Sequence, residues 1–202
     1  KGAYYTKEDV TGYMTNNAIV PKFLERLHEA TGINPWAHVV AQPERFIWSS
    51  VTHGADIELP ESVLAERDSW PRHSWSAAEP EPEIALPGES WWEVVQRRDR
   101  LAELRGGLES GKIRTANHAV TENIDLLTLA VDVVDAISSP DDVVKAWDIL
   151  TDLRVVDPTC GSGAFLFAAL ITLEALYGAV LDAARLHARS TDHVAVLELV
   201  EM

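Results

Sequence analysis

The chain has 202 residues, a formal net charge of −15 at pH 7 and one cysteine. Hydrophobic residues make up 47% of it and charged residues 24%, a globular composition that excludes a fully disordered or collagen-like protein. The single cysteine excludes an internal disulfide framework, and the first ten residues lack the apolar core of a secretory signal. We therefore expect a cytoplasmic protein.

The negative charge is unevenly spread, and its distribution bears on nucleic-acid binding. Residues 91–114 carry six basic and four acidic side chains, whereas residues 115–202 carry four basic and fourteen acidic ones. Affinity for a nucleic-acid backbone comes from Lys and Arg side chains that neutralise phosphates. We therefore expect any DNA contact to lie mainly outside this chain.

Residues 8–31 carry apolar side chains at helical spacing, which predicts a helix. Thr6, with Asp9 three residues later, resembles a capping box for its start. Residues 32–90 hold seven of the ten prolines and four of the seven tryptophans, so we expect an irregular insertion packed over the core. Its last part, residues 79–87, is predicted to be an extended connector because its prolines exclude a helix.

Three further helices are predicted from apolar spacing and end signals, over residues 91–104, 117–137 and 139–150. The first is expected to end at the Gly-Gly pair 106–107. The third is expected to be capped by Ser139, with a proline in its first turn.

The pattern then changes to one typical of a buried sheet. Residues 153–157 form a short apolar run closed by Asp157, which predicts a parallel strand, and residues 194–200 are a candidate second strand. Between them, residues 164–181 are almost wholly apolar, which predicts a helix packed on that sheet. A membrane span is the alternative, disfavoured by Glu174 in the middle of the run and by the lack of a basic flank.

A strand, a glycine-containing turn and a helix form the first unit of a nucleotide-type α/β fold. Gly161 and Gly163 let the backbone approach a ligand, the helix amino terminus suits a carboxylate or phosphate, and Asp157 can accept from an ammonium or hydroxyl group. Neither G-x-G-x-x-G nor the P-loop pattern is present. These residues fit a ligand with one cation and one carboxylate, such as the amino-acid part of S-adenosylmethionine; a turn without ligand is the alternative.

Residues 156–166, VDPTCGSGAFL, resemble the first S-adenosylmethionine-binding motif of adenine-N6 DNA methyltransferases. The likeness is closest to the large restriction-modification and phage-defence type, whose motif is D-P-x-C-G-S-G-x-F-L. Residues 2–10, GAYYTKEDV, resemble the motif G-x-Y-Y-T-P-x-x-V near the start of that family's catalytic domain, with Lys7 in place of proline. Residues 90–105 and 123–127 are also similar to the family.

The resemblance implies an α/β fold, in which an N-terminal helical region precedes the first βα units of a Rossmann-like S-adenosylmethionine-dependent methyltransferase. Together with the composition along the chain, it leads us to expect four parts. These are a cofactor-wall motif and helix (1–35), the Pro/Trp-rich insertion (36–90), a helical region (91–152) and the start of the Rossmann-like core (153–202).

Carried over from the family, Tyr5 and Thr6 would reach the cofactor carboxylate from one wall. The loop around the methionine part of the cofactor would comprise Asp157, Pro158, Thr159, Cys160, Gly161, Ser162 and Gly163. A nucleophilic role for Cys160 is disfavoured because no His or Asp pattern accompanies it. No metal is expected, since no Cys/His cluster has zinc spacing.

The family transfers the methyl group of S-adenosylmethionine to the N6 amine of an adenine flipped out of DNA. That step uses a tetrapeptide [NDS]-P-P-[YFW], which the chain lacks; residues 34–36 come nearest but have no second proline. The acidic residue for the cofactor ribose is not evident either, Glu198 being a weak candidate. No catalytic residue is therefore assigned in this chain.

We therefore expect the cofactor-binding, amino-terminal fragment of a site-specific adenine-N6 DNA methyltransferase, inactive alone. DNA would be contacted through regions outside the chain, other subunits of a defence system are candidate partners, and no membrane contact is expected. A non-catalytic methyltransferase-fold binding or regulatory subunit is one alternative. A methyltransferase acting on RNA or protein is another.

Overall fold

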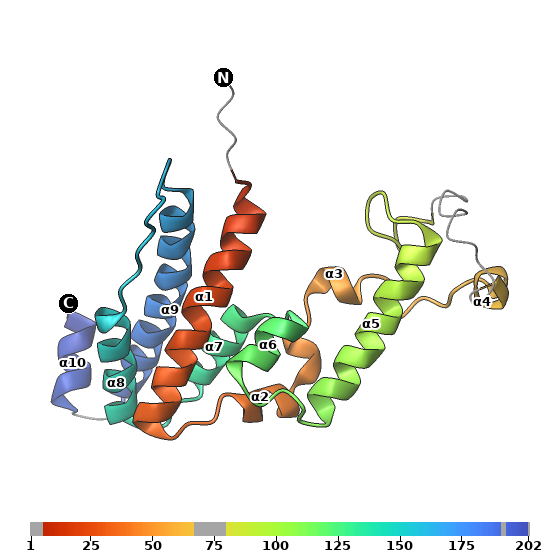
Figure 1. Ribbon diagram of the computed structural model, residues 1–202. Coiled ribbons are helices and arrows are strands. Elements are labelled where there is room, and N and C mark those ends of the chain that lie inside the picture. The colour runs from red at the N-terminus through yellow and green to blue at the C-terminus, as the bar shows by residue number, and fades with distance from the viewer. Residues whose placement is uncertain (1–5, 67–79, 191–192, 202) are drawn as a thin grey trace.

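The computed structural model describes residues 6–66, 80–190 and 193–201, and every regular element in these residues is helical (Figure 1). The elements are α1 (Glu8–Thr31), α2 (Trp36–Ala41), η1 (Pro43–Phe46), α3 (Ser49–Thr52), α4 (Glu61–Glu66), α5 (Trp91–Glu109), α6 (Ala116–Glu122), α7 (Leu126–Asp135), α8 (Pro140–Asp152), α9 (Ala164–Ala188) and α10 (Val194–Glu201). The predicted α/β, Rossmann-like fold is therefore wrong, since the described residues contain no strand.

Neither of the two predicted strands forms. Residues 153–157 connect α8 to α9 without any strand pairing, and Val156 is 81% exposed. A strand needs a neighbour to complete its hydrogen-bond ladder, and the described residues offer none. Residues 194–200 lie in α10, where Val196 and Leu199, three residues apart, are both buried. A short apolar run fits either a strand or a helix, and here packing against α8 and α9 selects the helix.

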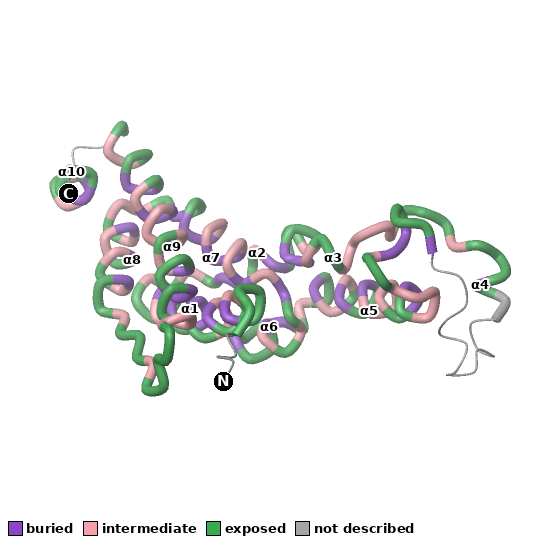
Figure 2. The backbone as a smooth tube through the Cα atoms, turned by 90° about the horizontal axis from the view of Figure 1, so that it is seen from above, coloured by how far each residue is buried: buried purple, intermediate pink, exposed green. Residues whose placement is uncertain are grey.

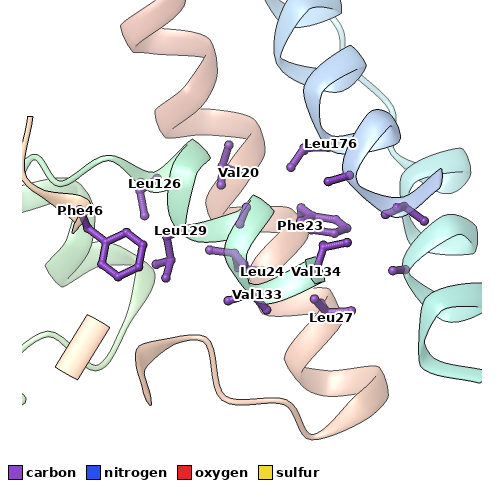
Figure 3. Packing of buried hydrophobic residues seen from close by; sticks show 14 of the residues in the cluster. Val20, Phe23, Leu24, Leu27, Phe46, Leu126, Leu129, Val133, Val134 and Leu176 are labelled. Carbon is purple, nitrogen blue, oxygen red and sulfur yellow. The ribbon is translucent and has the colours of Figure 1, made fainter. Parts of the chain in front are cut away.

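The core lies between α1, α7, α8 and α9, and α1 packs most extensively against α9. Figure 3 shows side chains of α1, α7 and α9 meeting in this core. Phe23 and Leu24 of α1, Leu129 of α7 and Leu176 of α9 are all completely buried. Burial of each of these side chains stabilises the fold by about 1.5–3 kcal/mol, because its apolar surface is removed from water. This apolar contact, formed between segments far apart in the sequence, holds α1 and α9 together.

Two predicted helices are confirmed with nearly the predicted bounds. Helix α1 ends at Gly32, whose φ of 74° is the left-handed conformation that glycine adopts most readily. It begins after Lys7 without a side-chain cap, so the predicted capping box of Thr6 and Asp9 is wrong. Helix α8 begins after Ser139, although that hydroxyl makes no capping hydrogen bond.

Two other predictions have wrong helix ends. Helix α5 continues through the Gly-Gly pair 106–107 to Glu109, because burial of Leu108 offsets the low helix propensity of glycine. The helix predicted over 117–137 is two helices, α6 and α7, separated by Asn123 at a φ of 54°. The break places Asp125 as the cap of α7, where its side chain accepts the backbone N–H of Thr128 at 3.1 Å.

Within residues 36–66 the chain forms short helices that, together with α5, extend to one side of the main helical bundle (Figure 2). Phe46 of η1 reaches into the main core, where it is almost wholly buried. The described part of the predicted connector, residues 80–87, turns tightly instead of extending. The backbone N–H groups of Ile84 and Ala85 both donate to the carbonyl of Glu81. Ile84 and Ala85 then pack on Val94 of α5.

Helix α9 is long and apolar enough, by length and composition, to cross a membrane, and it is the only such helix in the part of the chain that the structure describes. One helix of this kind is weak evidence for a span, because a helix packed inside a protein passes the same test. One side of α9 faces the core through Leu176 and Val180, whereas Phe167, Leu170 and Ile171 near its start are exposed. The absence of membrane contact stays a prediction.

Candidate functional site

The loop before α9 carries seven of the nine predicted cofactor residues, and Asp157 organises it. Its Oδ1 accepts the backbone N–H of Thr159 at 2.9 Å and the Thr159 hydroxyl at 3.3 Å, which closes a tight turn around Pro158. Its Oδ2 is buried and has no hydrogen-bond partner among the described residues. Oδ2 therefore has acceptor capacity that none of the described residues uses.

Gly161 and Gly163 both have positive φ, 53° and 81°. A Cβ atom at Gly161 would lie 3.6 Å from the carbonyl of Thr159, and one at Gly163 would lie 4.0 Å from the Sγ of Cys160. Both positions therefore have room for a methyl group, and the requirement for glycine comes from the backbone conformation. The N–H of Gly163 donates to the carbonyl of Cys160 at 2.7 Å, which completes the turn into α9.

The amino terminus of α9 offers donors to an anion. Its cap is Gly163, which has no side chain to accept a hydrogen bond, and its first turn contains no acidic residue. The first N–H groups of the helix therefore lack side-chain acceptors, and the helix dipole places partial positive charge there. Donors of this kind suit a carboxylate or phosphate.

The predicted second wall of the site directly precedes α1 in the sequence, and α1 runs parallel to α9 (Figure 1). Thr15 Oγ1 of α1 lies 3.5 Å from Thr172 Oγ1 of α9. Lys7, the cap of α1, lies eight residues before Thr15. Gly163, the cap of α9, lies nine residues before Thr172. At 1.5 Å per residue these are about 12 and about 13.5 Å, so the two helices begin at nearly the same level.

This arrangement places Thr6 at the same end of the helix pair as the 157–163 loop, although 151 positions separate Thr6 from Asp157 in the sequence. Thr6 is exposed. Tyr5, the other predicted wall residue, lies outside the described residues. The site therefore has two parts, one from each parallel helix, and solvent reaches both. Pro158, Thr159, Cys160, Gly161 and Ser162 are all exposed.

Sequence reasoning missed a polar contact that joins the two helices. The hydroxyl of Thr172 donates to Oδ1 of Asn16 at 2.6 Å, and both residues lie beside Thr15. The available signal was Thr172 itself, one of few polar residues in the apolar run of α9. Its partner could not be found from the sequence, because Asn16 lies on a helix 156 positions away.

The described residues contain no group of three or more His, Cys, Asp and Glu side chains placed to hold a metal ion. Cavities occur elsewhere, for example one of about 530 Å³ lined by Arg100, Lys112 and His118. In this cavity, Nη2 of Arg100 already forms an ion pair with the Glu122 carboxylate at 2.5 Å. The loop and helix ends therefore remain the best candidate site.

No protein-family model, no curated protein and no solved structure matches this chain. The likeness to adenine-N6 DNA methyltransferases rests on the sequence motifs alone and stays a prediction.

Proposed function

We propose that this chain binds S-adenosylmethionine at the shared amino-terminal end of α1 and α9, as the cofactor-binding part of a site-specific adenine-N6 DNA methyltransferase. The observation that supports it best is the parallel pairing of these helices. The two motifs that resemble the family lie far apart in the sequence, and this pairing sets residue 6 at the same end as residues 157–163.

The charges at this end match an amino acid in its zwitterionic form. Oδ2 of Asp157, which lacks a donor, would accept from the cofactor ammonium group. The N–H groups that begin α9, together with the hydroxyl of Thr6, would donate to the cofactor carboxylate. Bound there, the cofactor would supply a sulfonium methyl group for transfer to the adenine amine.

Methyl transfer would depend on groups that these 202 residues lack. The chain contains no [NDS]-P-P-[YFW] sequence to hold the adenine amine, and its net charge of −15 opposes binding to DNA phosphates. We therefore propose that DNA binding and the transfer step belong to other regions of a longer protein. Because the loop is exposed, cofactor affinity of this chain alone is expected to be low.

The experiment is nuclear magnetic resonance titration of the chain with millimolar S-adenosylmethionine, which detects weak binding. The matched variants are Asp157→Asn, which removes the loop carboxylate, and Asp148→Asn, which removes an exposed carboxylate on α8. We expect chemical-shift changes at Thr6 and residues 157–166, reduced at least tenfold in Asp157→Asn and retained in Asp148→Asn. No shift in the folded native chain, or equal shifts in Asp157→Asn, would overturn the proposal.

A further inference from the structure

A cluster of hydroxyl and amide groups lies where α1 contacts α9. Three polar residues are buried in the described part of the chain, Thr11 and Thr15 of α1 and Thr172 of α9. The last two meet at 3.5 Å, and the hydroxyl of Thr172 donates to Oδ1 of Asn16 at 2.6 Å. Thr15 donates within its own helix, to the carbonyl of Thr11 at 2.9 Å. The Thr172–Asn16 bond is therefore the short contact between the two helices.

The side chains nearest this bond specify the axial position less sharply than a hydrogen bond does. One turn before Thr172, α9 presents the small buried residues Ala168 and Ala169. Further along α1, Ile19 and Val20 are buried in the same apolar core. Apolar contact is non-directional, and a stripe of small residues tolerates sliding of one helix along another. A hydrogen bond does not tolerate it, because an axial shift of one helical turn, about 5.4 Å, takes donor and acceptor out of bonding distance.

No other described contact between these two helices takes over this role. The ion pair of Arg26 with Asp152, at 3.0 Å, joins α1 to the end of α8, not to α9, and the Asp152 side chain is 71% exposed. Exposed ion pairs of this kind contribute little. Thr172 has a second acceptor, the carbonyl of Ala168 in its own helix at 3.2 Å. A shift would therefore leave Oδ1 of Asn16, not the hydroxyl, without its partner.

We propose that Thr172 and Asn16 set the axial register of α1 against α9, and that they are positioning residues which keep Thr6 level with the 157–163 loop. The effect on cofactor rests on the proposed function, whereas the effect on register does not. Both helices continue unbroken from this bond to their amino termini, so a change of register in the middle is carried to the site. Buried polar pairs elsewhere in proteins set helix register in the same way.

The first test measures the register directly, in a Cys160→Ser background. Spin labels are attached at Glu29→Cys and Phe167→Cys, which are both exposed helical positions. At 1.5 Å per residue on each side of the Thr15–Thr172 contact, the two labels lie about 28 Å apart along the helix axes. Pulsed electron paramagnetic resonance gives the distribution of this distance. We expect one narrow distribution in this labelled chain.

The decisive variant is Thr172→Val, which keeps the shape and removes the hydroxyl. We expect its distribution to broaden or to shift by up to about one helical turn, 5.4 Å. Thr172→Ser restores the hydroxyl and should restore the narrow distribution. Asn16→Ala removes the acceptor from the partly exposed side and should reproduce the effect of valine, which keeps the test open if Thr172→Val does not fold.

The matched control is Thr151→Val, since that hydroxyl donates only within its own helix, to the carbonyl of Asp148 at 2.9 Å. It should leave the distance unchanged. An unchanged narrow distribution in both Thr172→Val and Asn16→Ala would overturn the proposal, whether or not the chain binds cofactor.

The second test repeats the S-adenosylmethionine titration on unlabelled variants. We expect affinity to fall at least fivefold in Thr172→Val and to recover in Thr172→Ser. An altered register with undiminished affinity would overturn the positioning role. No binding by the native chain would overturn the proposed function, while the distance measurement would still decide the register.

Discussion

Arg97 and Glu89 form a two-armed ion pair: Nε of the guanidinium donates to one carboxylate oxygen at 2.8 Å and Nη2 donates to the other at 2.9 Å. Both side chains are about one-tenth exposed, at 10% and 11%. Nη2 also donates to the carbonyl of Ile84 at 2.9 Å, and Nη1 donates to the carbonyl of His53. This one side chain therefore ties α5 to the turn before it and to the segment after α3.

Replacement of the guanidinium should unfold this part of the molecule locally. Arg97→Met leaves the Glu89 carboxylate partly buried without its cation, which we expect to cost about 3 kcal/mol of local stability. Hydrogen exchange of residues 80–97 measures the loss. Arg105→Met is the matched control, because its ion pair with Glu44 is 39% and 52% exposed and contributes at most about 1 kcal/mol. Equal protection in the two variants would contradict the assignment.

The same pair should make this region sensitive to acid. Burial alone would raise the pKa of Glu89, but hydrogen bonds from Arg97 and from the backbone N–H of Leu86 outweigh it and hold the pKa below its usual value. The pair therefore stabilises the folded state fully above the unfolded pKa of about 4.3, and the stability falls as pH drops through the lower folded pKa. Exchange protection of residues 80–97 should be constant from pH 7 to 5 and fall below pH 4. A flat profile in Glu89→Gln is the control.

Replacement by alanine of a glycine before α9 and of a glycine within α9 should change the stability in opposite directions. Gly163→Ala forces alanine into a left-handed conformation and should destabilise by about 1–2 kcal/mol. Gly178→Ala lies in the middle of the helix with open space around the new methyl group, and should stabilise by about 0.5–1 kcal/mol. Urea unfolding measures both changes, and two changes of the same sign would show that the loop conformation is misassigned.

Two leucines on α9 distinguish its buried and exposed sides. Leu176→Ala removes a completely buried side chain and should destabilise the chain by about 2–5 kcal/mol. Leu170, six residues earlier, is 61% exposed, so Leu170→Ala should change the stability by no more than about 0.5 kcal/mol. Thermal unfolding compares the two. A large loss in Leu170→Ala would mean that this side of α9 is covered in solution.

Part of this structure was predictable because its signals are local. The end of α1 at Gly32 and the start of α8 at Pro140 follow from backbone conformations that these residue types favour. The break at Asn123 was not predicted, although asparagine tolerates a positive φ. It depends on the backbone N–H of Asp125, which donates to the carbonyl of Phe46 at 2.8 Å, a partner from a distant segment.

The predicted strands failed for a related reason. The apolar runs at residues 153–157 and 194–200 are compatible with a strand, but a strand exists only beside another strand. Among the described residues, the first run has no such neighbour and the second is packed as a helix on α8 and α9. Composition of a short run cannot supply that information, because it depends on what the rest of the chain places next to it.

The sequence by itself determined helix α1, the first two thirds of helix α9 and the glycine-containing turn before α9. These features depend on backbone sterics and on hydrogen bonds to near neighbours. Only the tertiary structure decided that α1 and α9 lie parallel, that Thr172 meets Asn16, and that residue 6 shares an end with residues 157–163. Those pairings depend on which apolar faces exclude water together, across separations that local sequence does not encode.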